Sequence, residues 1–173
     1  RIKGHENGVQ ALRDLATASA ELGIRYLTVY AFSTENWNRP KIEVNALMRL
    51  LVSTLNAELD TLQKNKNKLN AIGNLKELPK SCFRELHDVI DATSHNDHMT
   101  LTLALSYGSR DELVQAVKTI SKDIASNQIS IDDIDEKLIS NNLFTSDIPD
   151  PDLLIRTSGE HRISNYLLWQ IAY

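Results

Sequence analysis

Hydrophobic positions along the chain follow two different periods, and segments of the two kinds alternate. Spacings of three and four predict helices over residues 5–22, 40–62, 79–93, 111–127 and 131–142. Short runs rich in β-branched, aromatic and other apolar residues predict strands over 26–32, 69–73, 99–106 and 153–156. Because strands alternate with helices, we expect a single α/β domain over residues 1–173, with a mostly parallel β-sheet flanked by helices.

Three polar loops follow predicted strands, at residues 33–39, 107–110 and 157–164, and each contains an arginine or directly follows one. In open parallel sheets, ligands bind beyond the carboxyl ends of the strands. These loops are therefore the first place to look for a binding site.

The last of these loops is framed by Arg156, Arg162 and Ser164. A guanidinium presents a fixed fork of donors that matches phosphate oxygens two at a time, and serine adds a short uncharged donor. The combination is typical of a diphosphate site. The alternative is a pair of surface arginines in ordinary salt bridges.

The loop before the second helix contains Asn36, Trp37 and Arg39, and Pro40 is suited to the first turn of that helix. A helix N-terminus attracts anions through its free N–H groups and its dipole. Capping is the local alternative, with one polar residue closing the N–H groups and Glu43 favouring the first turn. Capping does not account for Asn36, Trp37 and Arg39 together, which favours a functional role.

Two other clusters favour a structural interpretation. The acidic run at 132–136 fits a solvated helix face. The group formed by His87, His95, Asp97 and His98 lacks the ligand spacing of a zinc site. We therefore predict that neither cluster binds a metal ion.

Composition limits the class of protein. The chain has 173 residues, 42% of them hydrophobic and 24% charged, which is typical of a globular domain. A net charge of −4 makes a nucleic-acid partner unexpected. The single cysteine, Cys82, excludes an internal disulfide and fits a reducing, cytoplasmic setting. No apolar run approaches membrane-spanning length. The chain begins on Arg1 and stops within an apolar run, so we expect both termini to be incomplete.

Several motifs occur in a fixed order along the whole chain: Arg1-x-x-Gly4-His5, then YAFSTENWNRP at 30–40 with Glu43, SYGSR at 106–110, and DLLIRTSGEHRISN at 152–165. In this order they resemble the cis-prenyltransferases, specifically the bacterial undecaprenyl diphosphate synthase type. The resemblance implies an enzyme that adds isopentenyl diphosphate units, with cis geometry, to an allylic diphosphate such as farnesyl diphosphate. The product would be undecaprenyl diphosphate, the lipid carrier for cell-wall glycan synthesis.

The resemblance also implies roles for individual residues. The allylic diphosphate would be held by Arg1, His5 and Arg39. The isopentenyl diphosphate would be held by Arg156, Arg162 and Ser164, in agreement with the chemistry of that loop. The reacting centre would be lined by Ser33, Asn36 and Trp37, with Glu43 at its mouth.

The family further implies Mg²⁺, a homodimer, and at most peripheral membrane contact through the lipid product. The aspartate segment and the glutamate that serve the metal lie outside this chain, so these 173 residues alone would be inactive. The apolar surface of the long helix, made up of Leu47, Met48, Leu50, Leu51 and Leu55, is either core or the wall of an apolar tunnel for the growing chain. Two other functions stay open: a non-catalytic partner subunit of the same fold, and a generic phosphate-binding α/β enzyme, which would not need Asn36, Trp37 and Glu43 beside the arginines.

Overall fold

The computed structural model describes the backbone of residues 2–173 and the side chains of residues 8–173. The chain forms two compact units, a first that ends at Ser106 and a second over Tyr107–Tyr173. The boundary falls between the last two residues of one strand. The single domain expected from the sequence therefore stays a prediction, and each unit is described by itself below.

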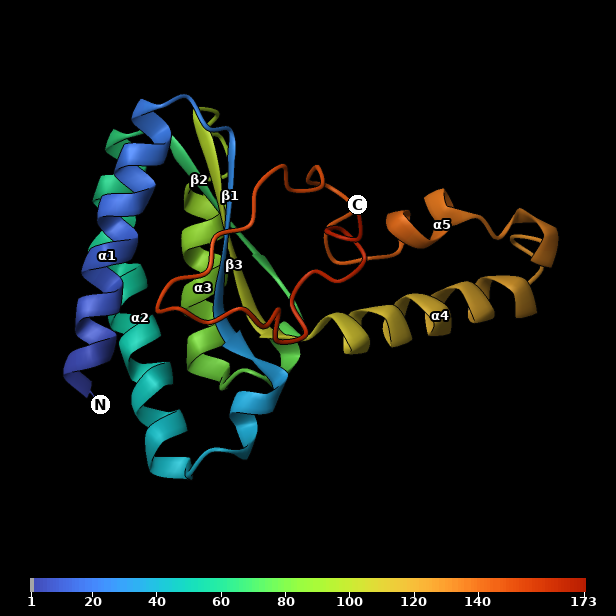
Figure 1. The fold of residues 1–173 in the computed structure, drawn as a ribbon, viewed down its shortest axis with the longest axis horizontal. Coiled ribbons are helices and arrows are strands. Elements are labelled where there is room, and N and C mark those ends of the chain that lie inside the picture. The colour runs from blue at the N-terminus through green and yellow to red at the C-terminus, as the bar shows by residue number, and fades with distance from the viewer. Residues whose placement is uncertain (1) are drawn as a thin grey trace. The chain divides into compact units, whose positions relative to one another are not determined.

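The first unit is a sheet with helices packed on it (Figure 1). In chain order its elements are α1 (Ile2–Glu21), β1 (Tyr26–Ser33), η1 (Thr34–Asn38), α2 (Lys41–Lys64), β2 (Asn67–Ile72), η2 (Leu75–Glu77), α3 (Lys80–Ala92) and β3 (Met99–Tyr107), where η denotes a 3₁₀ helix. The strand order is β1-β3-β2. Strands β2 and β3 pair in parallel, from Asn67 opposite Met99 to Ile72 opposite Ala104.

The core of this unit lies where α2 and α3 pack against each other and against β2. Helix α3 shows why the sequence folds this way, because Cys82, Leu86 and Val89 follow helical spacing and all three are buried. Met48 and Leu55 of α2 are buried in the same cluster. A fully buried side chain of this size stabilises the fold by about 1.5–3 kcal/mol, so the packed helix faces hold the sheet in place.

The sequence predictions for this unit are confirmed to within a few residues. The first three helices and three strands lie where the two periods placed them. The loop expected over 33–39 contains η1, with Ser33 as its N-cap. Thus the polar residues of that loop sit on a short helix that β1 leads into directly.

The second unit contains α4 (Ser109–Ala125), η3 (Ile131–Asp133) and α5 (Glu136–Asn141), and the rest of it is loops and turns. The sequence predicted one acidic helix over 131–142, whereas the structure has two short pieces. Two N-caps lie within this segment. Asp132 donates its N–H to Ser130 Oγ at 3.3 Å, and Leu138 donates its N–H to Asp135 Oδ1 at 2.7 Å. Each cap starts its own helix, so the segment breaks between them.

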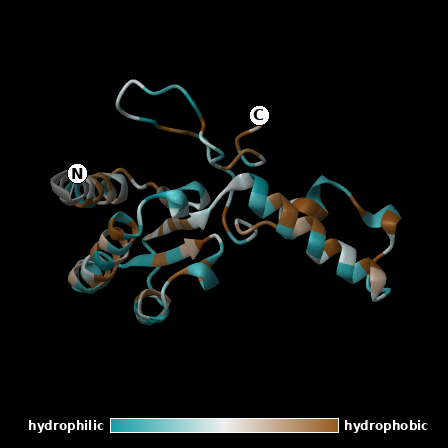
Figure 2. Cartoon of the chain, turned by 90° about the horizontal axis from the view of Figure 1, so that it is seen from below, coloured by the Kyte–Doolittle hydropathy of each residue, from teal (hydrophilic) through white to brown (hydrophobic). Residues whose placement is uncertain are grey.

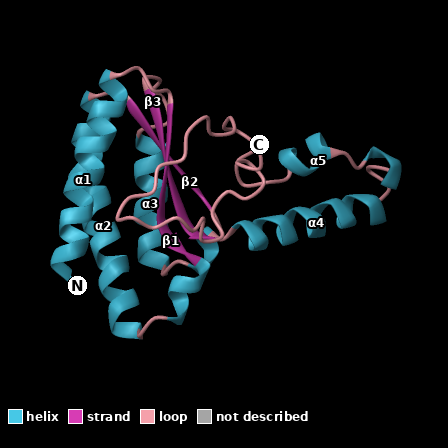
Figure 3. Cartoon of the chain, in the orientation of Figure 1, coloured by secondary structure: helices cyan, strands magenta, loops and turns pink. Residues whose placement is uncertain are grey.

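The strand predicted over 153–156 is wrong. This part of the chain is drawn as a loop in Figure 3, although Figure 2 shows hydrophobic colour along it. Leu153 is 74% exposed and Ile155 is 70% exposed. A strand needs a neighbouring backbone to satisfy its N–H and C=O groups. Within the described part of the chain, this run joins no sheet.

A buried carboxylate organises the second unit. Glu112, in the first turn of α4, is fully buried. It accepts hydrogen bonds from Tyr107 Oη at 2.6 Å, from the Phe144 N–H at 2.9 Å and from Gln170 Nε2 at 3.2 Å. Burial raises the pKa of Glu112, and these hydrogen bonds oppose the rise. The carboxylate thus joins α4 to two distant segments of its unit.

Gly73 allows β2 and β3 to end side by side. It follows β2 with a φ of 114°, and a Cβ at this position would lie 2.1 Å from the Leu105 carbonyl oxygen. Only glycine permits both this backbone conformation and this close approach. The position therefore fixes how closely the chain after β2 lies against the end of β3.

We expect Gly73→Ala to lower the free energy of unfolding by about 2–4 kcal/mol, because it combines a left-handed backbone with a steric clash. Gly23→Ala is the matched control. Gly23 also has a positive φ, of 77°, but nothing lies within 4 Å of a Cβ there. Its cost should be only about 1 kcal/mol. Urea denaturation of both variants measures the difference, and equal costs would show that the close approach does not matter.

Glu112 should make stability depend on pH in a specific direction. Its pKa in the folded protein lies above the ordinary value of 4.5, so the folded state binds this proton more tightly than the unfolded state. The contribution of Glu112 to the free energy of unfolding therefore falls as pH rises from 4.5 through the raised pKa. Glu112→Gln removes this term, and Glu136→Gln on exposed α5 is the control.

Denaturation of the wild type and of both variants from about pH 4 to pH 8 tests this sign. The stability of the wild type relative to Glu112→Gln should decline as pH rises, and Glu136→Gln, which keeps Glu112, should show this decline as well. Parallel curves for wild type and Glu112→Gln would contradict the assignment.

Candidate functional site

Polar side chains of the first unit meet at the carboxyl edge of the sheet. The side chain of Trp37, on η1, donates its indole N–H to Ser106 Oγ at 2.8 Å. Trp37 also packs edge-on against Phe32, with ring centroids 4.8 Å apart. The loop after β1 is thereby fixed against the end of β3, as expected for loops that leave parallel strands at one edge.

Asn36 has a structural role that the sequence did not reveal. Its Oδ1 accepts the Ser33 N–H at 3.1 Å, which closes the start of η1. Capping therefore accounts for more of this loop than the sequence suggested. Ser33, Asn36 and Trp37 are all partly buried and lie on consecutive turns at the end of β1.

Arg39 and Glu43 form an ion pair across the start of α2. Arg39 Nη1 lies 2.9 Å from Glu43 Oε1, and the two side chains are 41% and 21% exposed. A pair this exposed contributes about 0–1 kcal/mol, so an incoming anion can replace it at little cost. Arg39 is not the only group that interacts with Glu43.

Two predicted ligands of the same anion, Arg1 and His5, fall outside what the structure describes. Arg1 precedes the described backbone, and the His5 side chain precedes the described side chains. Their roles stay predictions.

Asn74 and Glu77 join this edge of the sheet and were missed by the sequence analysis. Asn74 donates its N–H to the Ser106 carbonyl at 3.1 Å, and the Ser106 hydroxyl donates to Glu77 Oε2 at 2.5 Å. A signal for them existed, because both directly follow the strand predicted at 69–73. The rule that selected the other strand-end loops also covers this one.

In the second unit, the structure brings together the residues predicted to bind a diphosphate. Arg156 Nη1 donates to Ser164 Oγ at 2.8 Å and to the Arg162 carbonyl. The Arg162 guanidinium lies 3.4 Å from Glu160, with the Arg162 side chain 71% exposed. Arg162 thus forms the surface salt bridge of the alternative interpretation, whereas Arg156 and Ser164 already form one polar cluster.

Asn165 connects this loop to the first turn of α4. Its carbonyl accepts the Ser109 N–H at 2.8 Å, and its Oδ1 accepts the Arg110 N–H at 2.9 Å. Ser164 and Asn165 both have positive φ, 56° and 59°. Two of the predicted loops, 107–110 and 157–164, therefore meet within the second unit. Asn165 thus occupies the N–H groups of Ser109 and Arg110 at the start of α4.

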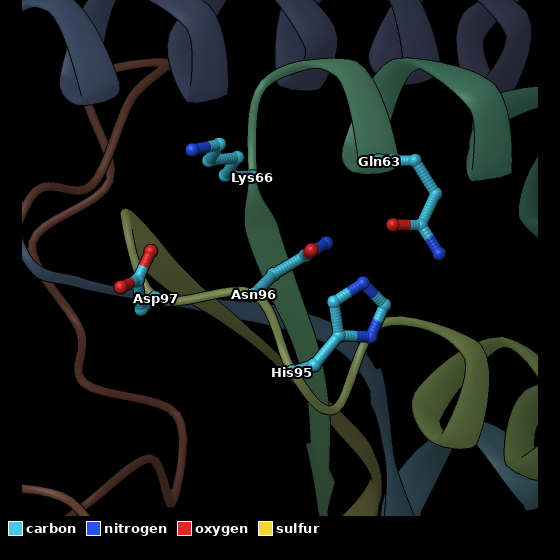
Figure 4. Close-up of a pocket in the computed structure, with 5 residues that line it drawn as sticks. All are labelled: Gln63, Lys66, His95, Asn96 and Asp97. Atoms are coloured by element: carbon cyan, nitrogen blue, oxygen red, sulfur yellow. The ribbon is translucent and has the colours of Figure 1, made fainter.

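A pocket at the opposite edge of the sheet does not fit a reaction site (Figure 4). It is lined by Gln63, Lys66, His95, Asn96 and Asp97, which precede β2 and β3 rather than follow them. Asn96 Nδ2 donates a hydrogen bond to the Asn67 carbonyl at 2.9 Å. In the close-up, His95 and Asp97 point away from each other. This pocket lies at the amino ends of the strands, where parallel sheets rarely bind ligands.

Among the described residues, no group of three or more His, Cys, Asp or Glu side chains could hold a metal ion. No described helix is both long enough and apolar enough to cross a membrane.

Comparisons with known proteins agree with this geometry. A family model described as "Putative undecaprenyl diphosphate synthase" matches residues 1–173. An isoprenyl transferase of Clostridium tetani is 50% identical over the whole chain, which spans 68% of that relative. A ditrans,polycis-undecaprenyl-diphosphate synthase of Micrococcus luteus, named as (2E,6E)-farnesyl-diphosphate specific, is 46% identical, and the chain spans 70% of it.

Solved structures show the same fold. The lavandulyl diphosphate synthase of Lavandula x intermedia, in complex with dimethylallyl diphosphate, matches with a TM-score of 0.93 and 34% identity, over 98% of this chain and 73% of that one. A probable undecaprenyl diphosphate synthase of Campylobacter jejuni matches with a TM-score of 0.85 and 35% identity, over 96% and 77% of the two chains. With its strand-end loops, its arginine-serine cluster and this similarity along its whole length, the chain belongs to the undecaprenyl diphosphate synthase family of prenyltransferases.

Proposed function

We propose that this chain carries out successive cis-condensation of isopentenyl diphosphate onto an allylic diphosphate, farnesyl diphosphate, to make undecaprenyl diphosphate. The observation that carries the proposal is the cluster of Arg156 and Ser164, whose side chains lie 2.8 Å apart beside Arg162. Family membership and the name of the Micrococcus luteus relative support the reaction and the allylic substrate. No observation favours a non-catalytic subunit.

The isopentenyl diphosphate would bind at this cluster. In the loop, Arg156 donates to an uncharged hydroxyl and a carbonyl, and Arg162 faces Glu160 at the exposed surface. A diphosphate offers these guanidiniums stronger, charge-assisted and bidentate hydrogen bonds. Replacing the ion pair between Arg162 and Glu160 by a diphosphate costs little, because exposed ion pairs are weak.

The allylic diphosphate would be held in the first unit by Arg39, together with Arg1 and His5. Arg39 lies at the start of α2, paired with Glu43. Ionisation of the allylic diphosphate breaks its C1–O bond and leaves the negative charge on the departing pyrophosphate. Cations placed in advance stabilise this charge more than they stabilise the intact substrate. C4 of isopentenyl diphosphate then bonds to allylic C1, and loss of a proton from C2 completes the step.

The growing hydrocarbon chain would enter an apolar cavity between α1, α2 and the sheet, whose walls would have to separate because the cavity is far smaller than a long prenyl chain. The cavity has a volume of about 80 Å³. Apolar side chains from all three parts line it: Val9, Leu12, Ala16, Leu55, Leu62, Leu69, Leu101 and Leu103. Leu55 belongs both to the packed core and to this lining. Of the five helix residues named in the sequence analysis, Leu55 alone lines this cavity, so the tunnel wall is proposed for this residue alone.

We further propose a cytoplasmic homodimer that requires Mg²⁺. The family resemblance supports all three points, and the free, buried Cys82 fits a reducing compartment. The described residues do not form a site that fits Mg²⁺. When bound, the ion would supply positive charge for the departing pyrophosphate.

Protein expressed from the complete gene should incorporate radiolabelled isopentenyl diphosphate into long-chain products when supplied with farnesyl diphosphate and magnesium. Chromatography of the dephosphorylated products gives their length, and circular dichroism checks that the protein is folded. Folded protein that forms no product longer than farnesyl would contradict the proposed reaction.

Substitutions at the two diphosphate sites should affect the KM values of different substrates. Arg156→Ala and Arg162→Ala should raise the KM for isopentenyl diphosphate by about 10- to 100-fold, the range expected for losing one charge-assisted hydrogen bond or a bidentate pair. The KM for farnesyl diphosphate should change far less, and Arg39→Ala should show the reverse preference. Arg84→Ala, on the exposed face of α3, is the control. Equal effects on both substrates would refute this division of roles.

A further inference from the structure

Ser106 lies at the centre of a chain of hydrogen bonds that joins three elements of the first unit. Trp37, on η1, donates its indole N–H to Ser106 Oγ at 2.8 Å. The Ser106 hydroxyl, at the end of β3, donates to Glu77 Oε2 at 2.5 Å on η2. Chain connectivity alone does not bring these three residues together, because they lie 69 and 29 positions apart.

The direction of both hydrogen bonds is fixed by the chemistry of the two ends. An indole N–H only donates, and an ionised carboxylate only accepts. The single hydroxyl proton of Ser106 must therefore point to Glu77, which leaves its oxygen lone pairs for Trp37. A hydroxyl that donates to a carboxylate is also a better acceptor, because neighbouring hydrogen bonds polarise each other.

The backbone holds Ser106 in the position that this chain needs. Its side chain is 1% exposed and its φ is +46°, a conformation that few residues other than glycine adopt. The Asn74 N–H donates to its carbonyl at 3.1 Å, and Gly73 lies close against the preceding Leu105. Backbone strain of this kind persists only where the surroundings enforce it, and it is concentrated at functional sites.

We propose that Glu77 is a positioning residue for Trp37, acting through the hydroxyl of Ser106. This inference rests on the proposed function and on the place at the reacting centre that the family resemblance implies for Trp37. Contact with Phe32 supports the Trp37 ring at its edge, and the hydrogen bond to Ser106 fixes its rotation. Without Glu77, the buried Ser106 proton loses its acceptor and must turn elsewhere, which weakens the bond to Trp37.

Fluorescence of Trp37 tests the proposal directly. The chain has two tryptophans, so Trp169→Phe leaves Trp37 as the single reporter. In that background, Glu77→Ala should shift the Trp37 emission maximum, and Glu77→Gln, which keeps an acceptor oxygen, should restore it. Lys76→Ala, an exposed change on the same short helix, should leave emission unchanged. An unshifted maximum in Glu77→Ala, or an equal shift in Lys76→Ala, would overturn the proposal.

Kinetics of the same variants test the consequence for the reaction. Glu77→Ala should lower kcat by about tenfold, the value of one hydrogen bond to a charged group, with the KM for isopentenyl diphosphate unchanged. Ser106→Ala should have the same effect, and the double variant should be no worse than either single one, because the two residues act as a unit. Additive losses would refute the relay. If the wild type elongates nothing, the proposed function fails, whereas the fluorescence result still decides whether Glu77 positions Trp37.

Discussion

The close approach of two strand ends is the constraint on which the first unit depends. Gly73 lets the chain after β2 run against the Leu105 carbonyl, and the Asn74 N–H then reaches the carbonyl of Ser106. With the ends of β2 and β3 fixed together, Ser106 can face Trp37 from the loop after β1. Backbone packing therefore forms the polar edge of the sheet, and it sets the positions of the side chains that lie there.

In the second unit, side-chain hydrogen bonds rather than strand pairing hold distant segments together. Glu112 holds Tyr107, Phe144 and Gln170 around the start of α4, while Asn165 accepts the Ser109 and Arg110 N–H groups. Loop residues without regular secondary structure are thus held by buried hydrogen bonds to one helix. A buried donor or acceptor without a partner costs free energy. Other arrangements of these loops, which would break the hydrogen bonds, are therefore disfavoured.

The sequence predicted well those features that depend on local periodicity. Helix α3 could be recognised because its buried residues follow one helical stripe, and β3 because Leu101, Leu103 and Leu105 alternate with Thr and Ala. The run at 153–156 has the same apolar character, yet it is a loop, because a strand also requires a partner that the run itself does not specify. Asn36 and Glu77 show the same limit at the site. Their hydrogen-bond partners depend on the turn and the strand ends that surround them, and composition does not encode these.

The hydrogen bonds of Arg156 have a consequence for which ligands the loop can hold. Nη1 of its guanidinium already donates to the Ser164 hydroxyl and to the Arg162 carbonyl. A ligand must therefore offer more negative charge than these neutral acceptors before the exchange becomes favourable. Water and neutral alcohols do not meet this requirement, whereas a diphosphate exceeds it several times over. For the diphosphate proposed above, these bonds set the charge that a ligand must carry to take Nη1 from its neutral acceptors.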